Sequence, residues 1–599
     1  MNAMLLVFCL LMTWVAPALA VTLPTAPAAT VDVTMPTVNG TTYNATCANL
    51  QSQLDAAAAA NVNLTHEIIL ATGTTCTGPY VLPSHTGGTG WILIKGTNYA
   101  SLPAAGTRVT LTDIALFPVI QYYENNSTGH MGAFSAATGA NRYRIIGIKG
   151  VQNDTCSGCN LAGTNYVGFV TTGYGGANST NTGYIIIDRS AYIDSSSTHS
   201  THQGVMLQAD NGNTAVIDSY IDGVKANARD ADTQCILSTA NAGPILIRNN
   251  FLRCAGENVM FGGGGTPSAA LVPRDATITL NTFTKDLAWA PGGNELIKTE
   301  LELKCGVRVL IEGNQFFNMP WDDGGYVFRL EARGQGGFQA PAEPWCEVSD
   351  VAIRSNLGSN VTNWIVSFGS DDFYGTKHSK RWAITNNLIY GLSYPTQPSS
   401  CATNNGVCGA FYTIQNGAIN STACTDPTPT CQMENLTIAH NTVNGVGSWI
   451  LSDIPTTQDQ IGLDFSNNLI GGCTNCSGMF RITPTQLYGS AMLAANWPGG
   501  YTMVNNLMQC CPSPGLDSTN YPQGTNVYTG NTTGWWTNVA ANDYTVPVTS
   551  PGYHTASDGT DKGVNFTTYN AAMAGISSGA TSVGGTSGTI RFSGSVRIQ

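Results

Sequence analysis

The chain has 599 residues, of which only 10% are charged and 67 are glycine, whereas ordinary soluble domains are about 25% charged. Its 42% hydrophobic residues and 11 tryptophans exclude a disordered chain, and its low charge excludes a coiled coil or helical bundle. The net charge of −12 comes with no basic run, so we expect no nucleic-acid partner.

The first twenty residues have the pattern of a secretory signal peptide. An apolar core covers residues 5–15, and Ala18-Leu19-Ala20 provides the small residues of a signal-peptidase site. No later stretch approaches the roughly 18–20 apolar residues that a membrane span requires. We therefore assign residues 1–20 to a signal peptide and expect a secreted or cell-surface protein with no membrane span.

Residues 21–90 are predicted to form an N-terminal cap and the first strands. The segment Asn49–Ala60 is a short helix with Leu50 and Leu54 on one side, and it can cover the exposed edge of a first coil. Alternating apolar residues at Ile68–Leu70 and Tyr80–Leu82 then indicate strands.

A repeated motif dominates residues 91–511. Alternating apolar residues are followed by a polar step, an asparagine and another apolar pair, and several copies lie about 30 residues apart, as a solenoid requires. Period-2 alternation indicates strands, and asparagine suits tight corners, where stacked copies would form an internal amide ladder. We predict an all-β, right-handed parallel β-helix. Copies of the motif include Ile245–Phe251, Ile278–Phe283, Leu310–Phe316, Ile384–Leu388, Ile438–Val443, Phe465–Leu469 and Val504–Leu507.

The repeat fades after about residue 511. Residues 512–576 are predicted to be an irregular segment that closes the C-terminal end. Residues 577–599 comprise a Gly/Ser/Thr linker and a terminal strand. This strand lacks a partner in the repeat, so strand addition to another protein is one expectation for it.

Seventeen cysteines are present, and sixteen remain once Cys9 leaves with the signal peptide. Many are close in sequence, which favours local disulfides in an exported chain over zinc binding by its CxxC pairs. Eight bridges would be completed by three longer pairs: Cys47 with Cys76, Cys235 with Cys254, and Cys305 with Cys346.

Six further features stand out along the chain: the Leu50 helix, Ala71–Thr75, Gly90–Ile92, Gly256–Gly263, Glu302–Lys304 followed by Val309–Asn314, and Asp543–Tyr544. In these segments the chain resembles exported bacterial right-handed parallel β-helix proteins of the pectate-lyase-like superfamily. That superfamily contains lyases, hydrolases and adhesins, so the resemblance implies the fold more than the chemistry.

The scarce charged residues concentrate between about residues 230 and 333. If Leu301 and Leu303 point inward, strict alternation places Lys298, Glu300, Glu302 and Lys304 outside, with Arg329, Glu331 and Arg333 one coil later. Adjacent coils lie about 4.8 Å apart, so these side chains would form one patch. Earlier coils add Asp232, Gln234, Glu257 and Asn258, and an outward Trp364 could stack on a sugar.

This row is similar to the site of the chondroitinase B and alginate lyase family, which cleaves acidic polysaccharides by β-elimination. The resemblance implies Lys304 as base, Arg329 and Arg333 as catalytic partners, and a Ca²⁺ ion that neutralises the uronate carboxylate. It implies calcium ligands from Glu300 and Glu302, with Asn258 as a weaker one. From their place in the row, we add Glu257 as a further calcium ligand and predict substrate contacts from Lys298, Glu331, Asp232, Gln234 and Trp364.

Two other functions fit the same residues. A glycoside hydrolase needs paired carboxylates, which Asp230, Asp232 and Glu257 offer. A glycan-binding adhesin or extracellular structural protein would use the charged row for binding alone, and in the simplest case the row is a solvated face of ion pairs.

Overall fold

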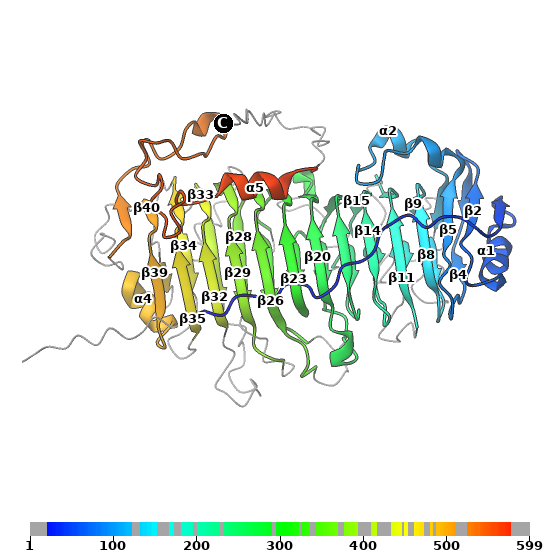
Figure 1. The fold of residues 1–599 in the computed structure, drawn as a ribbon, viewed down its shortest axis with the longest axis horizontal. Coiled ribbons are helices and arrows are strands. Elements are labelled where there is room, and N and C mark those ends of the chain that lie inside the picture. The colour runs from blue at the N-terminus through cyan, green and yellow to red at the C-terminus, as the bar shows by residue number, and fades with distance from the viewer. Residues whose placement is uncertain are drawn as a thin grey trace, which may run out of the picture.

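The fold was analysed in a computed structural model, which describes residues 21–122, 132–152, 167–172, 181–195, 200–226, 232–289, 295–322, 325–334, 343–368, 376–392, 409–415, 433–445, 448–452, 460–472, 480–482, 487–509 and 524–576. Three long sheets run along the molecule, and each coil of the chain supplies one strand to each sheet (Figure 1). The chain is a right-handed parallel β-helix, as the repeat predicted.

Sheet A receives the strand that precedes the asparagine of each motif. Its neighbouring strands pair in parallel throughout the described residues. In order, its strands are β1 (Thr42–Ala45), β2 (His66–Leu70), β5 (Ile92–Gly96), β8 (Asn141–Ile146), β11 (Gly183–Asp188), β14 (Thr214–Ile217), β17 (Ile245–Arg248), β20 (Arg274–Thr279), β23 (Gly306–Glu312), β26 (Val348–Arg354), β29 (Lys380–Thr385), β32 (Glu434–Ala439), β35 (Ile461–Ser466) and β39 (Tyr501–Val504).

Sheet B receives the strand that follows the asparagine. Only a two-residue bend separates it from sheet A in most coils. In order, its strands are β3 (Thr75–Thr77), β6 (Val119–Tyr122), β9 (Lys149–Gln152), β12 (Ala191–Ile193), β15 (Tyr220–Val224), β18 (Phe251–Cys254), β21 (Thr282–Thr284), β24 (Gln315–Met319), β27 (Leu357–Val361), β30 (Leu388–Leu392), β33 (Thr442–Asn444), β36 (Leu469–Gly471), β40 (Leu507–Gln509) and β41 (Val527–Thr529).

Sheet C closes each coil and carries the charged segments. Its described strands pair in parallel, except for the final pair, which is antiparallel. In order, its strands are β4 (Tyr80–Leu82), β7 (Phe134–Ala136), β10 (Val167–Thr171), β13 (Gln203–Met206), β16 (Gln234–Ser238), β19 (Glu257–Phe261), β22 (Thr299–Leu303), β25 (Tyr326–Glu331), β28 (Asn363–Phe368), β31 (Ala410–Gln415), β34 (Ser448–Ser452), β37 (Phe480–Ile482) and β38 (Leu487–Tyr488).

Helices cover both ends of the core. At the N-terminal end, α1 (Leu50–Ala59) buries Leu50 and Leu54 completely, which confirms the predicted capping helix. At the other end, α4 (Gly489–Asn496) joins the same core through Met492 and Leu493. The sequence reading missed α4, because an eight-residue helix carries too few turns to establish a period of 3.6 residues.

The predicted asparagine ladder is present at the bend between sheets A and B. Each ladder side chain donates to the carboxamide oxygen of the next coil, and that oxygen also accepts from the ladder residue's own backbone N–H. In Asn-Asn pairs the first residue adopts the left-handed conformation, with φ of 57° at Asn249, and the second is the ladder member. In the described residues the ladder comprises Asn250, Asn281, Asn314, Asn356, Asn387, Asn441, Asn468, Asn506 and Asn526.

Replacing the ladder residue Asn356 by alanine is expected to lower the free energy of unfolding by about 1–3 kcal/mol. The substitution removes the oxygen that accepts hydrogen bonds from the backbone N–H and the side-chain amide of Asn314, which are buried. Urea unfolding measures the change. The control is Asn63→Ala at an exposed position, which should change stability by less than about 0.5 kcal/mol. An equal effect of both substitutions would contradict a structural role for the ladder.

The N-terminal segment, residues 21–40, runs along the outer face of sheet A as a strap (Figure 1, dark blue). Thr22 N–H donates to Asn435, Thr25 N–H to Asp350 and Ala28 N–H to Asp275, at 3.1, 2.8 and 2.7 Å. Farther along, the carbonyl of Val33 accepts from the guanidinium of Arg144. The strap therefore contacts widely separated coils, which the repeat alone did not predict.

The C-terminal segment packs along sheet B instead of closing the end of the β-helix. It places Trp535, Trp536 and Tyr544, and then α5 (Phe566–Met573), over the strands of sheet B (Figure 1). The covered residues are leucines that directly follow ladder asparagines: Leu357, Leu388, Leu469 and Leu507.

Three predicted disulfides are confirmed: Cys47–Cys76, Cys235–Cys254 and Cys305–Cys346. The remaining cysteine pairs, the predicted signal peptide and residues 577–599 lie outside the described residues. Among the described residues, no helix combines the length and apolarity needed to cross a membrane.

Candidate functional site on the outer face of sheet C

Most of the predicted charged row gathers on the outer face of sheet C. Leu301 and Leu303 of β22 lie in the core, so Glu302 between them points outward and pairs across the sheet with Arg329 of β25. We call the connected side chains the sheet C network. Its members are Asp232, Gln234, Glu257, Lys298, Glu302, Lys304, Arg329, Glu331 and Arg333.

Glu302 is the centre of this network. Its carboxylate is fully buried and lies 3.5 Å from both the Lys304 ammonium and the Arg329 guanidinium. Although burial alone would favour the neutral acid, these cations and nearby Lys298 hold the pKa of Glu302 well below its usual range. Glu302 is therefore an ionised carboxylate at neutral pH.

Glu257 is the second buried carboxyl group of the network and behaves in the opposite way. Burial raises the pKa of Glu257 to about 7, and its partner Lys298, at 3.1 Å, only partly offsets this. Gln234 Nε2 donates to Glu257 at 2.9 Å, and the negative charge of Glu302 also raises the pKa of Glu257. Of these two carboxyl groups, Glu257 therefore holds a proton much more readily than Glu302.

The accessible part of the network lies at its edges. The side chains of Arg329 and Arg333 are 23% and 31% exposed. Both guanidinium groups pair with the carboxylate of Glu331, that of Arg329 at 2.9 Å and that of Arg333 at 3.7 Å. On the other side, Asp232 is 46% exposed and binds Lys298 at 2.9 Å. A ligand can therefore reach the two arginines and Asp232 more readily than the buried carboxyl groups.

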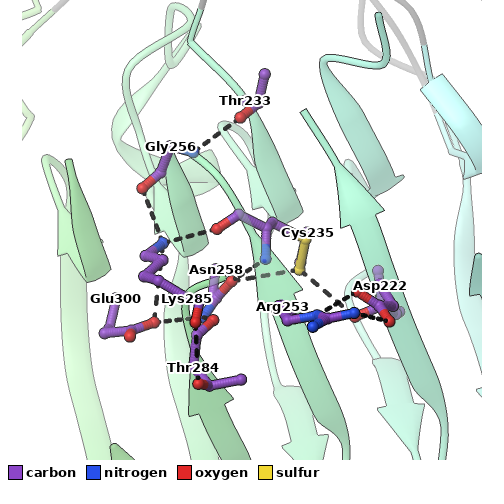
Figure 2. The surroundings of a disulfide bond; sticks show 11 residues. Asp222, Thr233, Cys235, Arg253, Gly256, Asn258, Thr284, Lys285 and Glu300 are labelled. Atoms are coloured by element: carbon purple, nitrogen blue, oxygen red, sulfur yellow. Dashed lines mark hydrogen bonds and ion pairs between the residues drawn. A yellow bond between two sulfur atoms is a disulfide. The ribbon is translucent and has the colours of Figure 1, made fainter. Parts of the chain in front are cut away.

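The prediction that Glu300 lies outside beside Glu302 is wrong. Glu300 is fully buried inside the β-helix, where it contacts Asn258 and lies 3.8 Å from Lys285 (Figure 2). Asn258 also points inward, since its carbonyl oxygen accepts from the backbone N–H of Cys254, a core residue. Glu300 and Glu302 therefore lie on opposite faces of one strand.

The prediction that Trp364 points outward is wrong for the same reason. This tryptophan is fully buried and packs edge-on against Phe316 and Phe328 of the core, so it offers no face to a sugar. The cause is an irregularity at the start of strand β28. The pairing with β25 skips one residue there, and the successive residues Trp364 and Ile365 both point into the core. Strict alternation fails at this corner in β19, β22, β25 and β28 alike.

The sequence reading missed Lys285. The register pairs Asn250 with Asn281, so four residues later Lys285 occupies the inward position that Cys254 holds one coil earlier. Alignment of the repeats, rather than alternation within one strand, would have placed a lysine in the core.

The four predicted calcium ligands do not fit one ion. Asn258 and Glu300 lie inside the β-helix, and Glu257 and Glu302 lie outside among three cationic side chains. A carboxylate already paired with Lys or Arg is a poor ligand for a further cation. Among the described residues one other group has metal-like spacing, Cys305, Glu343 and Cys346, but its two sulfur atoms form a disulfide.

No protein-family model matches the chain, and no curated protein matches its sequence. Among solved structures it is similar to the PL6 family alginate lyase AlyGC, with 11% identity and a TM-score of 0.42, over 82% of this chain and 51% of that one. The chain thus spans about half the length of that lyase.

Two further similar structures belong to proteins with different roles. One is a mannuronic acid specific polysaccharide family 6 lyase from human gut microbiota, at 10% identity and TM-score 0.44, covering 82% of this chain and 92% of that chain. The other is PfbA, a surface adhesin of Streptococcus pneumoniae, at 14% identity and TM-score 0.33, covering 66% and 87%. The chemistry must therefore be argued from the residues of the site.

Proposed function

We propose that the protein acts on an acidic, uronate-containing polysaccharide that binds along the outer face of sheet C, and that it cleaves this polymer by β-elimination. The observation that carries the proposal is the gathering of Lys298, Lys304, Arg329 and Arg333 on adjacent coils of a chain that is only 10% charged. Clustered cations attract a polymer that carries repeated carboxylates.

Elimination removes the weakly acidic proton beside the uronate carboxylate while the bond to the leaving sugar oxygen breaks. Arg329 and Arg333, the exposed cations of the network, would neutralise the carboxylate and so stabilise the charge that develops. Lys304 is the proposed base. Because it is paired with Glu302 at 3.5 Å, this role requires the pair to open and Lys304 to lose its proton before it accepts one from the sugar.

The other residues that were predicted to contact the substrate differ in whether a sugar can reach them. Asp232 and Lys298 lie where a neighbouring sugar could bind, and Glu331 orients Arg329 at 2.9 Å. Gln234 is buried against Glu257, so we assign it a supporting role. Trp364 and the calcium ion have no part in the proposed site, because the tryptophan and two of the four predicted calcium ligands lie inside the core.

A glycoside hydrolase is less well supported. A glycosidase needs two carboxyl groups that flank the bond to be cleaved. Of the three predicted carboxyl groups, Glu257 is fully buried and pairs with Lys298 at 3.1 Å. Asp232 binds the same lysine at 2.9 Å, and Asp230 lies outside the described residues.

The three disulfides of the described residues support export, since such bonds persist in oxidising compartments. We therefore propose that the protein is secreted or displayed at the cell surface, where polysaccharides are accessible. A non-catalytic adhesin would use the same cations, so the experiment below must separate binding from cleavage.

The test is to incubate the mature protein with mannuronate, guluronate and galacturonate polymers, with calcium and with chelator, and to follow the ultraviolet absorbance of the unsaturated product. We expect a rise that survives chelation and that Arg329→Ala lowers on the order of 100-fold. The control, Arg354→Ala, removes a cation paired with Glu312 on sheet A and should leave the rate unchanged.

Other outcomes would overturn the lyase proposal. Reducing ends without a double bond would indicate a hydrolase, and binding without either product would indicate an adhesin. A rise that chelator abolishes would instead support a lyase and overturn only the role proposed for the arginines, because a bound cation would then neutralise the uronate carboxylate.

A further inference from the structure

A lysine, an asparagine and a glutamate converge inside the β-helix beside the Cys235–Cys254 disulfide (Figure 2). The side chains of Lys285 and Glu300 have no exposed surface, and Asn258 is fully buried. Asn258 and Glu300 come from the neighbouring strands β19 and β22 of sheet C, and Lys285 directly follows β21 of sheet B. The residues that follow Asn258 and Glu300, Val259 and Leu301, belong to the hydrophobic core.

We infer that Lys285 and Asn258 become joined by an intramolecular amide bond, and that Glu300 is the acid–base group for its formation. The proposal is independent of any activity on polysaccharide.

One oxygen atom of Glu300 links the two reacting groups. Glu300 Oε2 contacts Asn258 Nδ2, the nitrogen that would leave, and lies 3.8 Å from Lys285 Nζ, the nucleophile. A carboxyl group in this position can move a proton from one nitrogen to the other. Lys285 Nζ is also held by the carbonyl oxygens of Cys254 and Gly256, at 2.9 and 3.0 Å.

The carbonyl group of Asn258 is prepared for attack. Its oxygen accepts a hydrogen bond from the backbone N–H of Cys254 at 2.7 Å. A donor in this position stabilises the negative charge that forms on the oxygen when the carbon becomes tetrahedral. The backbone N–H of Cys254 is therefore the proposed oxyanion donor.

The step balances without any further reactant. The lone pair of Lys285 Nζ forms a bond to Asn258 Cγ, the Cγ–Nδ2 bond breaks, and ammonia leaves with that electron pair. Glu300 gives a proton to the leaving nitrogen and recovers one from Nζ, so it ends in its initial state.

The surroundings favour the reactive protonation states. Burial lowers the pKa of Lys285, which makes the neutral, nucleophilic amine more accessible. Burial also raises the pKa of Glu300 to about 7, so this carboxyl group holds a proton that it can donate. Exclusion of water from the core would protect the finished amide from hydrolysis.

The test is the intact mass of the full-length mature protein after reduction of its disulfides. We expect a mass below that of the sequence by one ammonia molecule. Trypsin cuts after Arg274 and so separates Asn258 from Lys285. Tandem mass spectrometry should therefore find these two peptides joined.

Four variants separate the proposal from its alternatives. Glu300→Gln and Lys285→Met should restore the full mass, while Lys95→Met, a surface lysine paired with Glu67, should keep the deficit. Asn258→Asp should form the same bond with loss of water, which tests the reaction even if another variant folds poorly. A full mass in the unmodified protein, or a peptide joined through Glu300 instead of Asn258, would overturn the assignment.

Discussion

Replacing Glu302 by glutamine is expected to lower the free energy of unfolding by about 3–5 kcal/mol, the effect of breaking a buried ion pair. The substitution keeps the shape of the side chain and removes only its charge. Lys304 and Arg329 then face each other across a neutral group, each 3.5 Å from it. The side chain of Lys304 is only 4% exposed, so water cannot compensate for the lost carboxylate.

Urea unfolding followed by tryptophan fluorescence measures this loss, and hydrogen exchange of the β22 amides locates it. The matched control is Glu312→Gln on sheet A, whose partner Arg354 is 49% exposed. An exposed pair contributes about 0–1 kcal/mol, so the control should change stability far less. Similar losses in both variants would show that the sheet C network is no more than a solvated surface.

The protein is expected to be more stable near pH 5 than at pH 7.5, with Glu257 as a principal cause. Its pKa is raised from 4.5 to about 7, so between these values the unfolded chain releases a proton that the folded chain retains. The stabilisation is therefore complete below pH 4.5 and is lost as the pH rises through 7. This difference in pKa corresponds to about 3 kcal/mol.

Thermal unfolding between pH 4.5 and 8 tests this dependence. Glu257→Gln should flatten the slope, because the amide is neutral at every pH and so resembles the protonated acid. Some slope should remain, since burial also raises the pKa of Glu300 and of Glu343 to about 7. An unchanged slope in the variant would mean that Glu257 is ionised in the folded protein.

Much of the fold could be predicted because its signals are local and repeated. The spacing of the asparagines predicted the repeating coil and the asparagine ladder. The positions of Leu50 and Leu54 predicted the N-terminal capping helix. Three cysteine pairs were identified correctly, because the other cysteines were assigned to partners close in sequence, which left these six to pair with one another. Each of these features recurs in, or is contained within, one short stretch of sequence.

The errors at the site have one physical origin. The prediction assumed that side chains point alternately inward and outward along the whole strand. The chain bends at the start of strands β19, β22, β25 and β28, and two successive side chains enter the core there. Glu300 and Trp364 were therefore assigned to the wrong face, whereas Glu302 and Arg329, farther along their strands, were placed correctly. The packing of residues 524–576 on sheet B was missed, although the outward Leu357 and Leu388 required some cover.

The N-terminal strap changes how the β-helix is expected to unfold. In a solenoid each repeat contacts only its neighbours, so coils can fray from either end with little cooperativity. The strap bonds Thr22 to Asn435, 413 residues away, and Ala28 to Asp275. If a coil in the middle opens, the strap is also released from its partners in distant coils. The strap therefore links the unfolding of these coils into one cooperative transition. Since these partners are synthesised hundreds of residues later, residues 21–40 are made early but are among the last to dock.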